Sequence, residues 1–300
     1  MNSIASIGFI GLGVMGTGMC ANLVAKSGLP VVGFDHDPAA IARQGGANFA
    51  AAGSLLDIAA RVDVLFLCLP SVKQVVEVLR GPEGILAHRG RVRTIIDMST
   101  SAVRETRALA ADAQAAGITY LDAPVARLRE AARLGTLSIM VGGPVDAFEK
   151  VRPLLACMGT DITHCGAVGA GQVVKILNNM TVFITAHALA EALAIGRRAG
   201  VDGELLFNTM ALGSSDSFVL RHQGMKHLVK DHFPQNAFPT DYALKDIDLA
   251  LELARDGSID AQLTATTRAL LARTRDAGYA RDYYPIMLRL IEAGTPTARA

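Results

Sequence analysis

The feature that most constrains this chain is a glycine-rich turn near its N-terminus. An apolar run, Ile4–Ile10, precedes the turn, and helically spaced apolar residues follow it as far as Lys26. In such a strand–turn–helix unit the first glycine permits a tight turn, the second lets the backbone approach a pyrophosphate, and the third lets the helix pack on the strand. The helix start adds unpaired N–H groups and a positive dipole for phosphates. The pattern predicts a dinucleotide site at Gly11, Gly13, Val14, Met15 and Gly16.

Asp35 closes the next short apolar run, at the place where such sites carry an acidic residue. Its carboxylate is expected to accept hydrogen bonds from both adenosine ribose hydroxyls and to repel a 2′-phosphate. His36 and Asp37 follow, so no arginine stands beside it to bind that phosphate. The sequence therefore favours NAD over NADP. The alternative is a solvated loop acid beside an ordinary turn. The glycine spacing, the strand–turn–helix context and the acid at Asp35 all favour the dinucleotide site instead.

Strand-like and helix-like segments alternate through the first half of the chain, which predicts a parallel sheet covered on both faces. The expected strands are Ile4–Ile10, Pro30–Asp35, Asp63–Leu69, Thr94–Met98, Thr119–Ala123 and Leu137–Val141. After Gly166 the strand patterns stop, and Gly169–Ala199 reads as one long helix that ends at Gly200. Further helices are expected at Gly203–Leu212, Thr240–Arg255, Ala261–Ala277 and Asp282–Ala293. We therefore expect an α/β domain over 1–165 and an all-α domain over 166–300.

Composition excludes several classes of function. The 300 residues are 51% hydrophobic and carry a net charge of +1 with interspersed signs, so neither a nucleic acid nor a membrane surface is an expected partner. The four cysteines form no CxxC pair, and the histidines form no cluster, so no metal is expected and a cytoplasmic location is favoured. No apolar stretch looks long and uninterrupted enough to span a bilayer.

Lys175 is the strongest candidate for a catalytic group. It lies near the start of the long helix in an otherwise apolar stretch, and Asn178 and Asn179 follow at i+3 and i+4 on the same face. Such polar groups are costly on an apolar face unless they serve a purpose. A neutral amine can take the hydroxyl proton during alcohol oxidation if its pKa falls from about 10.4 to roughly 7–8. The alternative is a lysine that extends to water, with the amides satisfying backbone groups.

Six ordered segments carry a resemblance to a known family. The first is Gly8–Gly16 with Asn22 and Leu23 downstream. The others are Leu69-Pro70, Asp97–Thr100, Asp122–Val125 with Gly135–Leu137, Gly169–Asn179, and Leu244–Ala250. Together they resemble the beta-hydroxyacid dehydrogenase family, which includes 3-hydroxyisobutyrate dehydrogenase, tartronate semialdehyde reductase and sulfolactaldehyde reductase. The resemblance covers nearly the whole chain.

The resemblance implies a Rossmann-type domain followed by a helical domain that begins with a long interdomain helix. It also implies individual roles for residues outside the glycine turn. Leu69 and Pro70 would border the cofactor, and Thr100 (or Ser99) would contact the nicotinamide ribose or ring. Lys245 would reach the cofactor and substrate from the second domain. Asn178 and Asn179 would hold the substrate, with Lys175 as general acid and base.

One segment departs from the family pattern at the expected substrate site. The family usually has Ser-Gly-Gly after Asp-Ala-Pro-Val, whereas this chain has Ala126-Arg127-Leu128. A guanidinium offers a planar fork of donors suited to a carboxylate, sulfonate or phosphate. Arg127 is therefore expected to anchor the acid group of a small anionic substrate, a carboxylate ahead of the sulfonate that sulfolactaldehyde reductases bind. The alternative is an arginine that points to solvent.

The sequence as a whole predicts an NAD-dependent dehydrogenase that interconverts a small acid semialdehyde and its hydroxy acid. The alternatives are a sulfolactaldehyde reductase, an imine reductase of similar fold, which usually lacks the lysine, and a non-catalytic NAD-binding sensor or scaffold. The apolar long helix also suggests a homo-oligomer, a dimer or a tetramer.

Overall fold

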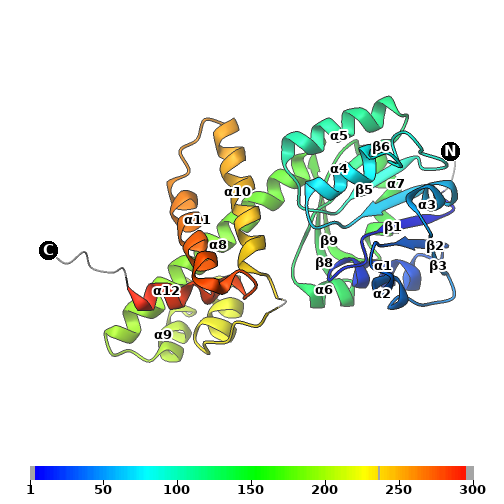
Figure 1. Ribbon diagram of the computed structural model, residues 1–300. Helices are drawn as coiled ribbons and strands as arrows, with labels where there is room; N and C mark the ends of the chain where they lie inside the picture. Colours follow the sequence, from blue (N-terminus) through cyan, green and yellow to red (C-terminus); the bar gives the residue numbers. More distant parts are fainter. Residues whose placement is uncertain (1–3, 236, 295–300) are drawn as a thin grey trace. The chain divides into compact units, whose positions relative to one another are not determined.

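A computed structural model describes residues 4–235 and 237–294. Its contacts divide the chain into two compact units, Met1–Lys175 and Ile176–Ala300 (Figure 1). The division lies inside the long helix, whereas the sequence pattern suggested a boundary between residues 165 and 166. Each unit has its own hydrophobic core.

The first unit is built around one mixed sheet in which β1 to β6 run parallel, as a Rossmann-like domain requires. The strands run in the order β3-β2-β1-β4-β5-β6-β8-β7, and β9 pairs with β8. Their bounds are β1 Ile7–Ile10, β2 Val31–Phe34, β3 Phe49–Ala51, β4 Val64–Leu67, β5 Thr94–Asp97, β6 Thr119–Asp122, β7 Val125–Ala126, β8 Leu137–Gly142 and β9 Gly159–Gly166.

Helices cover both faces of this sheet, which explains why its central strands are apolar throughout. Along β4, Phe66 packs into the core on one face, while Leu65 and Leu67 pack into the core on the other. The helices are α1 Gly16–Lys26, α2 Pro38–Ala42, α3 Leu55–Arg61, α4 Val72–Arg80, α5 Val103–Ala115, α6 Arg129–Leu134 and α7 Val145–Leu155.

Strand β8 departs from the predicted parallel sheet, and strands β3, β7 and β9 were not predicted. Strand β8 runs antiparallel to β6 and β7. Strand β9 pairs only with β8, and several of its residues are polar and exposed, so it lacks the apolar run that marks a buried strand.

The second unit is helical over its described residues, as predicted. Helix α8, Ala170–Arg198, ends before Gly200, whose φ of 83° suits a helix stop. The remaining elements are α9 Gly203–Met210, the π-helix η1 Leu220–Leu228, α10 Thr240–Asp256, α11 Gln262–Thr274, the π-turn η2 Arg275–Tyr279, the 3₁₀ turn η3 Tyr284–Met287 and α12 Leu288–Ala293. The sequence did not predict η1, because its Arg, His, Gln and Lys residues obscure the apolar period.

Helix α8 differs from the sequence expectation in one respect. By length and composition it could cross a membrane, although no such stretch was expected. Core helices of globular proteins pass the same test. Consistent with that, Phe183, Ala186 and Leu193 of α8 are buried in the core of the second unit.

Candidate active site

The glycine turn between β1 and α1 has one position that is open and two that are closed. Gly11 has φ of 96°, and a Cβ there would lie 2.2 Å from the Cys68 carbonyl oxygen. A Cβ on Gly16 would lie 1.9 Å from the Gly11 carbonyl oxygen. A Cβ on Gly13 would have no neighbour within 4 Å. The fold therefore requires Gly11 and Gly16, whereas Gly13 leaves space beside the turn, where a bound group can approach the backbone.

The start of α1 offers its N–H groups to an anion. Its N-cap residue, Met15, makes no side-chain capping hydrogen bond, and no acidic residue lies in the first turn. Unpaired N–H groups and the helix dipole favour a bound phosphate here. The open Gly13 and this uncapped helix start fit the pyrophosphate of a dinucleotide. They lie after β1, next to β4, where the strand order reverses and open α/β sheets bind ligands.

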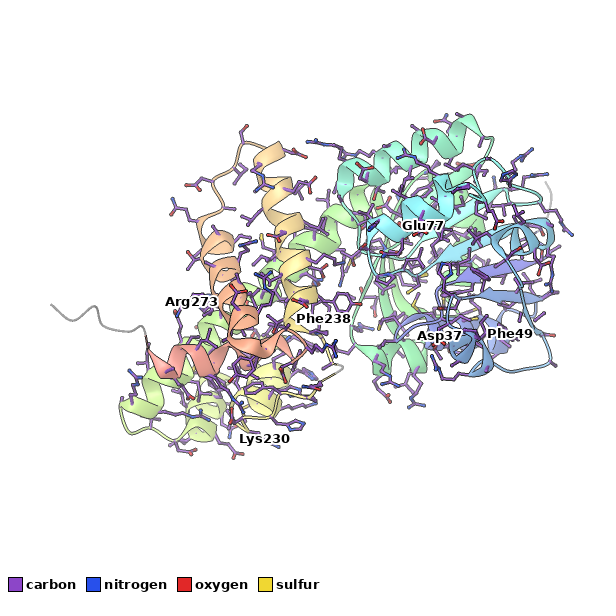
Figure 2. The ribbon with its side chains drawn as sticks, viewed as in Figure 1. Asp37, Phe49, Glu77, Lys230, Phe238 and Arg273 are labelled. Carbon is purple, nitrogen blue, oxygen red and sulfur yellow. The ribbon has the colours of Figure 1, made fainter. Side chains whose placement is uncertain are left out.

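Asp35, half-buried just after β2, holds the glycine turn. Its Oδ2 accepts a hydrogen bond from the Leu12 N–H at 2.6 Å, and its Oδ1 accepts one from the Asp37 N–H at 2.9 Å. Asp37, labelled in Figure 2, caps α2 by accepting a hydrogen bond from the Ala39 N–H. Both acidic residues therefore lie at the end of β2, and Asp37 also pairs with Arg43 at 3.8 Å.

The loops after β4 and β5 are joined by a hydrogen bond. The Leu69 N–H donates to Ser99 Oγ at 2.9 Å, and the Ser99 N–H donates to Asp97 Oδ1 at 2.9 Å. Ser99 is buried, whereas Thr100 is half-buried and Pro70 is exposed. Of the two candidates in this loop, Thr100 is the more accessible to a ligand, because the Ser99 hydroxyl is used internally.

A buried carboxylate supports these loops and was not predicted from the sequence. The Tyr120 hydroxyl donates to Asp97 Oδ2 at 2.9 Å. Burial raises the pKa of Asp97 to about 6, although hydrogen bonds from Ser99 and Tyr120 oppose the rise. The sequence does show an acidic residue, Asp97, at the end of an apolar strand. Its partner Tyr120 lies on the neighbouring strand β6, which only the fold reveals.

Lys175 and Asn179 are buried on α8, and Asn178 is exposed. Lys175 is 9% exposed and Asn179 is 7% exposed, as expected for one polar face on consecutive turns. Asn178 was expected on that same face, but it is exposed and donates from Nδ2 to Asn179 Oδ1 at 3.2 Å.

Within the second unit, one buried carboxylate connects two of the predicted site residues. Asn179 Nδ2 donates to Asp246 Oδ2 at 2.6 Å, and Lys245 Nζ pairs with Asp246 Oδ1 at 3.0 Å. Asp246 is 3% exposed. No role was predicted for Asp246, because nothing in the sequence around residue 245 indicates a partner on α8.

Arg127 adopts a backbone conformation that favours glycine, with φ of 79°. The family pattern has glycine at this place, so the turn keeps the glycine conformation with a different side chain. The guanidinium donates to the Thr136 carbonyl oxygen at 2.5 Å and to Thr160 Oγ1 at 3.1 Å, and it pairs with Asp161 at 2.7 Å. The side chain is 42% exposed and lies against the start of β8 and of β9. In this structure it is thus bound by its own unit.

Among residues 4–235 and 237–294, no three His, Cys, Asp or Glu side chains gather as metal ligands would.

Comparison with known proteins agrees with this arrangement. Residues 6–166 match the model of the NAD-binding domain of 6-phosphogluconate dehydrogenase. Residues 169–291 match the model described as the NAD-binding domain of NADP-dependent 3-hydroxyisobutyrate dehydrogenase.

Three relatives match over nearly their whole length. The 2-(hydroxymethyl)glutarate dehydrogenase of Eubacterium barkeri is 34% identical over 98% of this chain and 97% of its own. The 3-hydroxyisobutyrate dehydrogenase of Pseudomonas aeruginosa is 36% identical over 90% of this chain and 92% of its own. The solved structure of Mycobacterium tuberculosis 3-hydroxyisobutyrate dehydrogenase with L-serine has a TM-score of 0.86 at 30% identity, covering 96% of this chain and 99% of that one.

Proposed function

Because this chain belongs to the beta-hydroxyacid dehydrogenase family, we propose that it is an NAD-dependent dehydrogenase that interconverts a small 3-hydroxy acid and its semialdehyde. The observation that carries the proposal is the buried Lys175, one helical turn before the buried Asn179, in a chain with an open glycine turn. A general acid and base requires a titratable group here, whereas binding of the dinucleotide alone does not.

The names of the relatives suggest the class of substrate. 2-(Hydroxymethyl)glutarate and 3-hydroxyisobutyrate both carry a CH₂OH group on the carbon that bears a carboxylate, and L-serine has the same two groups. Only the third substituent on that carbon differs. We therefore infer a substrate of the form HOCH₂–CHR–COO⁻, which is oxidised to the aldehyde OHC–CHR–COO⁻.

A nicotinamide cofactor bound at the glycine turn would supply the hydride chemistry, as acceptor for the alcohol and donor for the aldehyde. Lys175, as a neutral amine, takes the hydroxyl proton during oxidation, and its ammonium returns that proton to the aldehyde oxygen during reduction. Asn179, with Asn178, is proposed to hold the substrate, while Arg127 anchors its acid group. Val14, Met15, Leu69, Pro70, Thr100 and Lys245 are proposed to contact the cofactor.

We propose NAD as the preferred cofactor because of the acidic end of β2. Asp35 lies at the end of β2, so a 2′-phosphate placed beside it would meet its negative charge, while Asp37 is paired with Arg43 at 3.8 Å. The Asp35 carboxylate keeps lone pairs for the ribose hydroxyls while it holds Leu12.

The first test is an NADH oxidation assay with a panel of acid aldehydes. Methylmalonate, tartronate and succinic semialdehydes and sulfolactaldehyde separate the substrate classes, and NADPH replaces NADH in parallel. We expect the highest kcat/KM with a semialdehyde of the form OHC–CHR–COO⁻, such as methylmalonate or tartronate semialdehyde, and NADH preferred over NADPH by at least about tenfold. A sulfolactaldehyde optimum would favour the sulfonate alternative. NADH binding with no turnover of any aldehyde would contradict a dehydrogenase and favour the sensor alternative.

A second prediction concerns Arg127 as the anchor of the substrate's acid group. Its guanidinium is paired with Asp161, so a substrate anion would compete with that carboxylate. Arg127→Ala is expected to raise the KM for acid aldehydes at least about tenfold, because charge-assisted hydrogen bonds are strong. Asp161→Asn is expected to lower that KM about two- to fivefold, because an exposed pair contributes little. Steady-state kinetics on each variant measure both changes.

Arg133→Ala is the matched control, since Arg133 is also exposed and also pairs with a carboxylate, that of Glu130. Its KM is expected to equal that of the wild type. An unchanged KM in Arg127→Ala would contradict the anchor role and leave Arg127 as a structural contact between β7 and β9.

The homo-oligomer and the cytoplasmic location stay predictions, which sedimentation and cell fractionation of the native protein measure.

A further inference from the structure

Gln172 is a buried amide side chain close to Lys175 that has no part in the mechanism above. It is 0% exposed and lies in the first turn of α8, three residues before Lys175. Residues three apart on a helix are neighbours on its surface. A fully buried polar side chain is costly unless its hydrogen bonds are made.

Both ends of the Gln172 amide bond to the backbone of one loop. Nε2 donates to the Ser99 carbonyl oxygen at 2.8 Å, and Oε1 accepts a hydrogen bond from the Ser101 N–H at 3.0 Å. These two groups flank Thr100, the loop residue proposed to contact the cofactor. The bridge requires a donor and an acceptor on one side chain, which an amide provides and a carboxylate or a hydrocarbon does not.

The helix end of this bridge is itself fixed. Asp122, at the end of β6, accepts hydrogen bonds from the Gly169 N–H at 2.7 Å and from the Gln172 N–H at 2.9 Å. A Cβ on Gly171 would lie 2.3 Å from the Met140 carbonyl oxygen, so the helix backbone rests directly on β8. The first turn of α8 therefore cannot shift without breaking contacts to the sheet.

The loop end connects onward to the dinucleotide turn. Ser99 Oγ accepts from the Leu69 N–H, and the Cys68 carbonyl beside Leu69 lies against Gly11. A continuous series of contacts thus runs from Gly11 through the loops after β4 and β5 to the Gln172 side chain. It ends one helical turn from the proposed general acid and base.

We propose that Gln172 is a positioning residue for hydride transfer, holding the Ser99–Ser101 loop at a set distance from the turn of α8 that carries Lys175. The proposal rests on the function proposed above. It predicts that Gln172 affects the chemical step more than it affects cofactor affinity, because small errors in alignment reduce the rate of transfer steeply.

The test compares Gln172→Leu and Gln172→Glu with Ser6→Ala. Ser6 is a buried polar residue just before β1, at the amino end of the parallel strands, and its hydroxyl makes two hydrogen bonds, both with Asp63. In Gln172→Leu we expect kcat to fall about a hundredfold, with the Kd for NADH within a factor of about three. The primary isotope effect with NADH deuterated at the transferred position is expected to rise. Ser6→Ala is expected to keep the wild-type kcat and isotope effect.

Gln172→Glu adds a readout that a merely structural role would not produce. An ionised glutamate cannot donate to the Ser99 carbonyl, but a protonated one can donate there and accept from the Ser101 N–H. The ratio of the variant's kcat to the wild-type kcat is therefore expected to rise as pH falls, while the ratio for Gln172→Leu stays flat. A ratio for Gln172→Glu that does not change with pH would overturn the proposal.

Amide hydrogen exchange of the protein without cofactor tests the bridge independently of activity. Exchange at Ser101 is expected to accelerate in Gln172→Leu and to stay unchanged in Ser6→Ala. If the wild type turns over no aldehyde, the proposed function fails, while the exchange result still reports on the bridge. If the wild type is active and Gln172→Leu keeps its kcat, the positioning role is wrong and the proposed function stands.

Discussion

Replacing Lys175 with alanine is expected to lower kcat about 10²- to 10⁴-fold, the usual contribution of a positioned general acid or base. The Kd for NADH should stay within a factor of about three, because the glycine turn and Asp35 remain intact. The loss is expected in both directions, since the same amine takes the hydroxyl proton and returns it. Stopped-flow measurement of NADH formation and consumption, with fluorescence titration of NADH, gives the two quantities separately.

Lys150→Ala provides the control, because Lys150 is an exposed lysine on α7 that pairs with Asp146. It should leave kcat and Kd unchanged. A further arm adds small primary amines to Lys175→Ala, since an amine of suitable size in the vacated space can restore the proton transfer. A Lys175→Ala variant that keeps more than about a tenth of the wild-type kcat would refute the assignment of general acid and base.

The site residues that could be predicted from the sequence are those that lie close together in the chain, on one turn or one helix. Gly11, Gly13 and Gly16 sit on one turn, and Lys175 and Asn179 sit on one helix, so spacing alone relates them. The alternation of apolar runs likewise predicted β1, β2, β4, β5, β6 and β8. Local patterns predict what lies on one element.

The parts that the sequence missed depend on pairs of residues far apart in the chain. Gln172 bonds to Ser99 and Asn179 bonds to Asp246, and neither member of either pair identifies the other by its local pattern. Arg127 shows the same limit, because its residue type predicted an anion partner but not that Asp161 would be one. A polar residue at the end of an apolar strand or on a buried helical turn is a signal for such partners, but only the fold pairs them.

Two of the three glycines of the glycine turn, Gly13 and Gly16, are expected to respond in opposite ways to the same added methyl group. In Gly13→Ala the new Cβ meets no atom within 4 Å, so the melting temperature should stay within about one degree of the wild type. The methyl group occupies the space through which a pyrophosphate would approach the backbone. We expect the Kd for NADH to rise at least about tenfold, measured by fluorescence titration.

In Gly16→Ala the new Cβ would lie 1.9 Å from the Gly11 carbonyl oxygen, which is backbone and cannot rotate away. The turn and α1 must separate, so the variant is expected to lose about 1–3 kcal/mol or more of unfolding free energy, measured by urea denaturation. The two variants separate the two reasons for a glycine at this turn. Gly16 is expected to be required for folding, and Gly13 for binding of the dinucleotide. Normal NADH affinity in Gly13→Ala would mean that the pyrophosphate does not cross this turn, and the dinucleotide site would have to lie elsewhere.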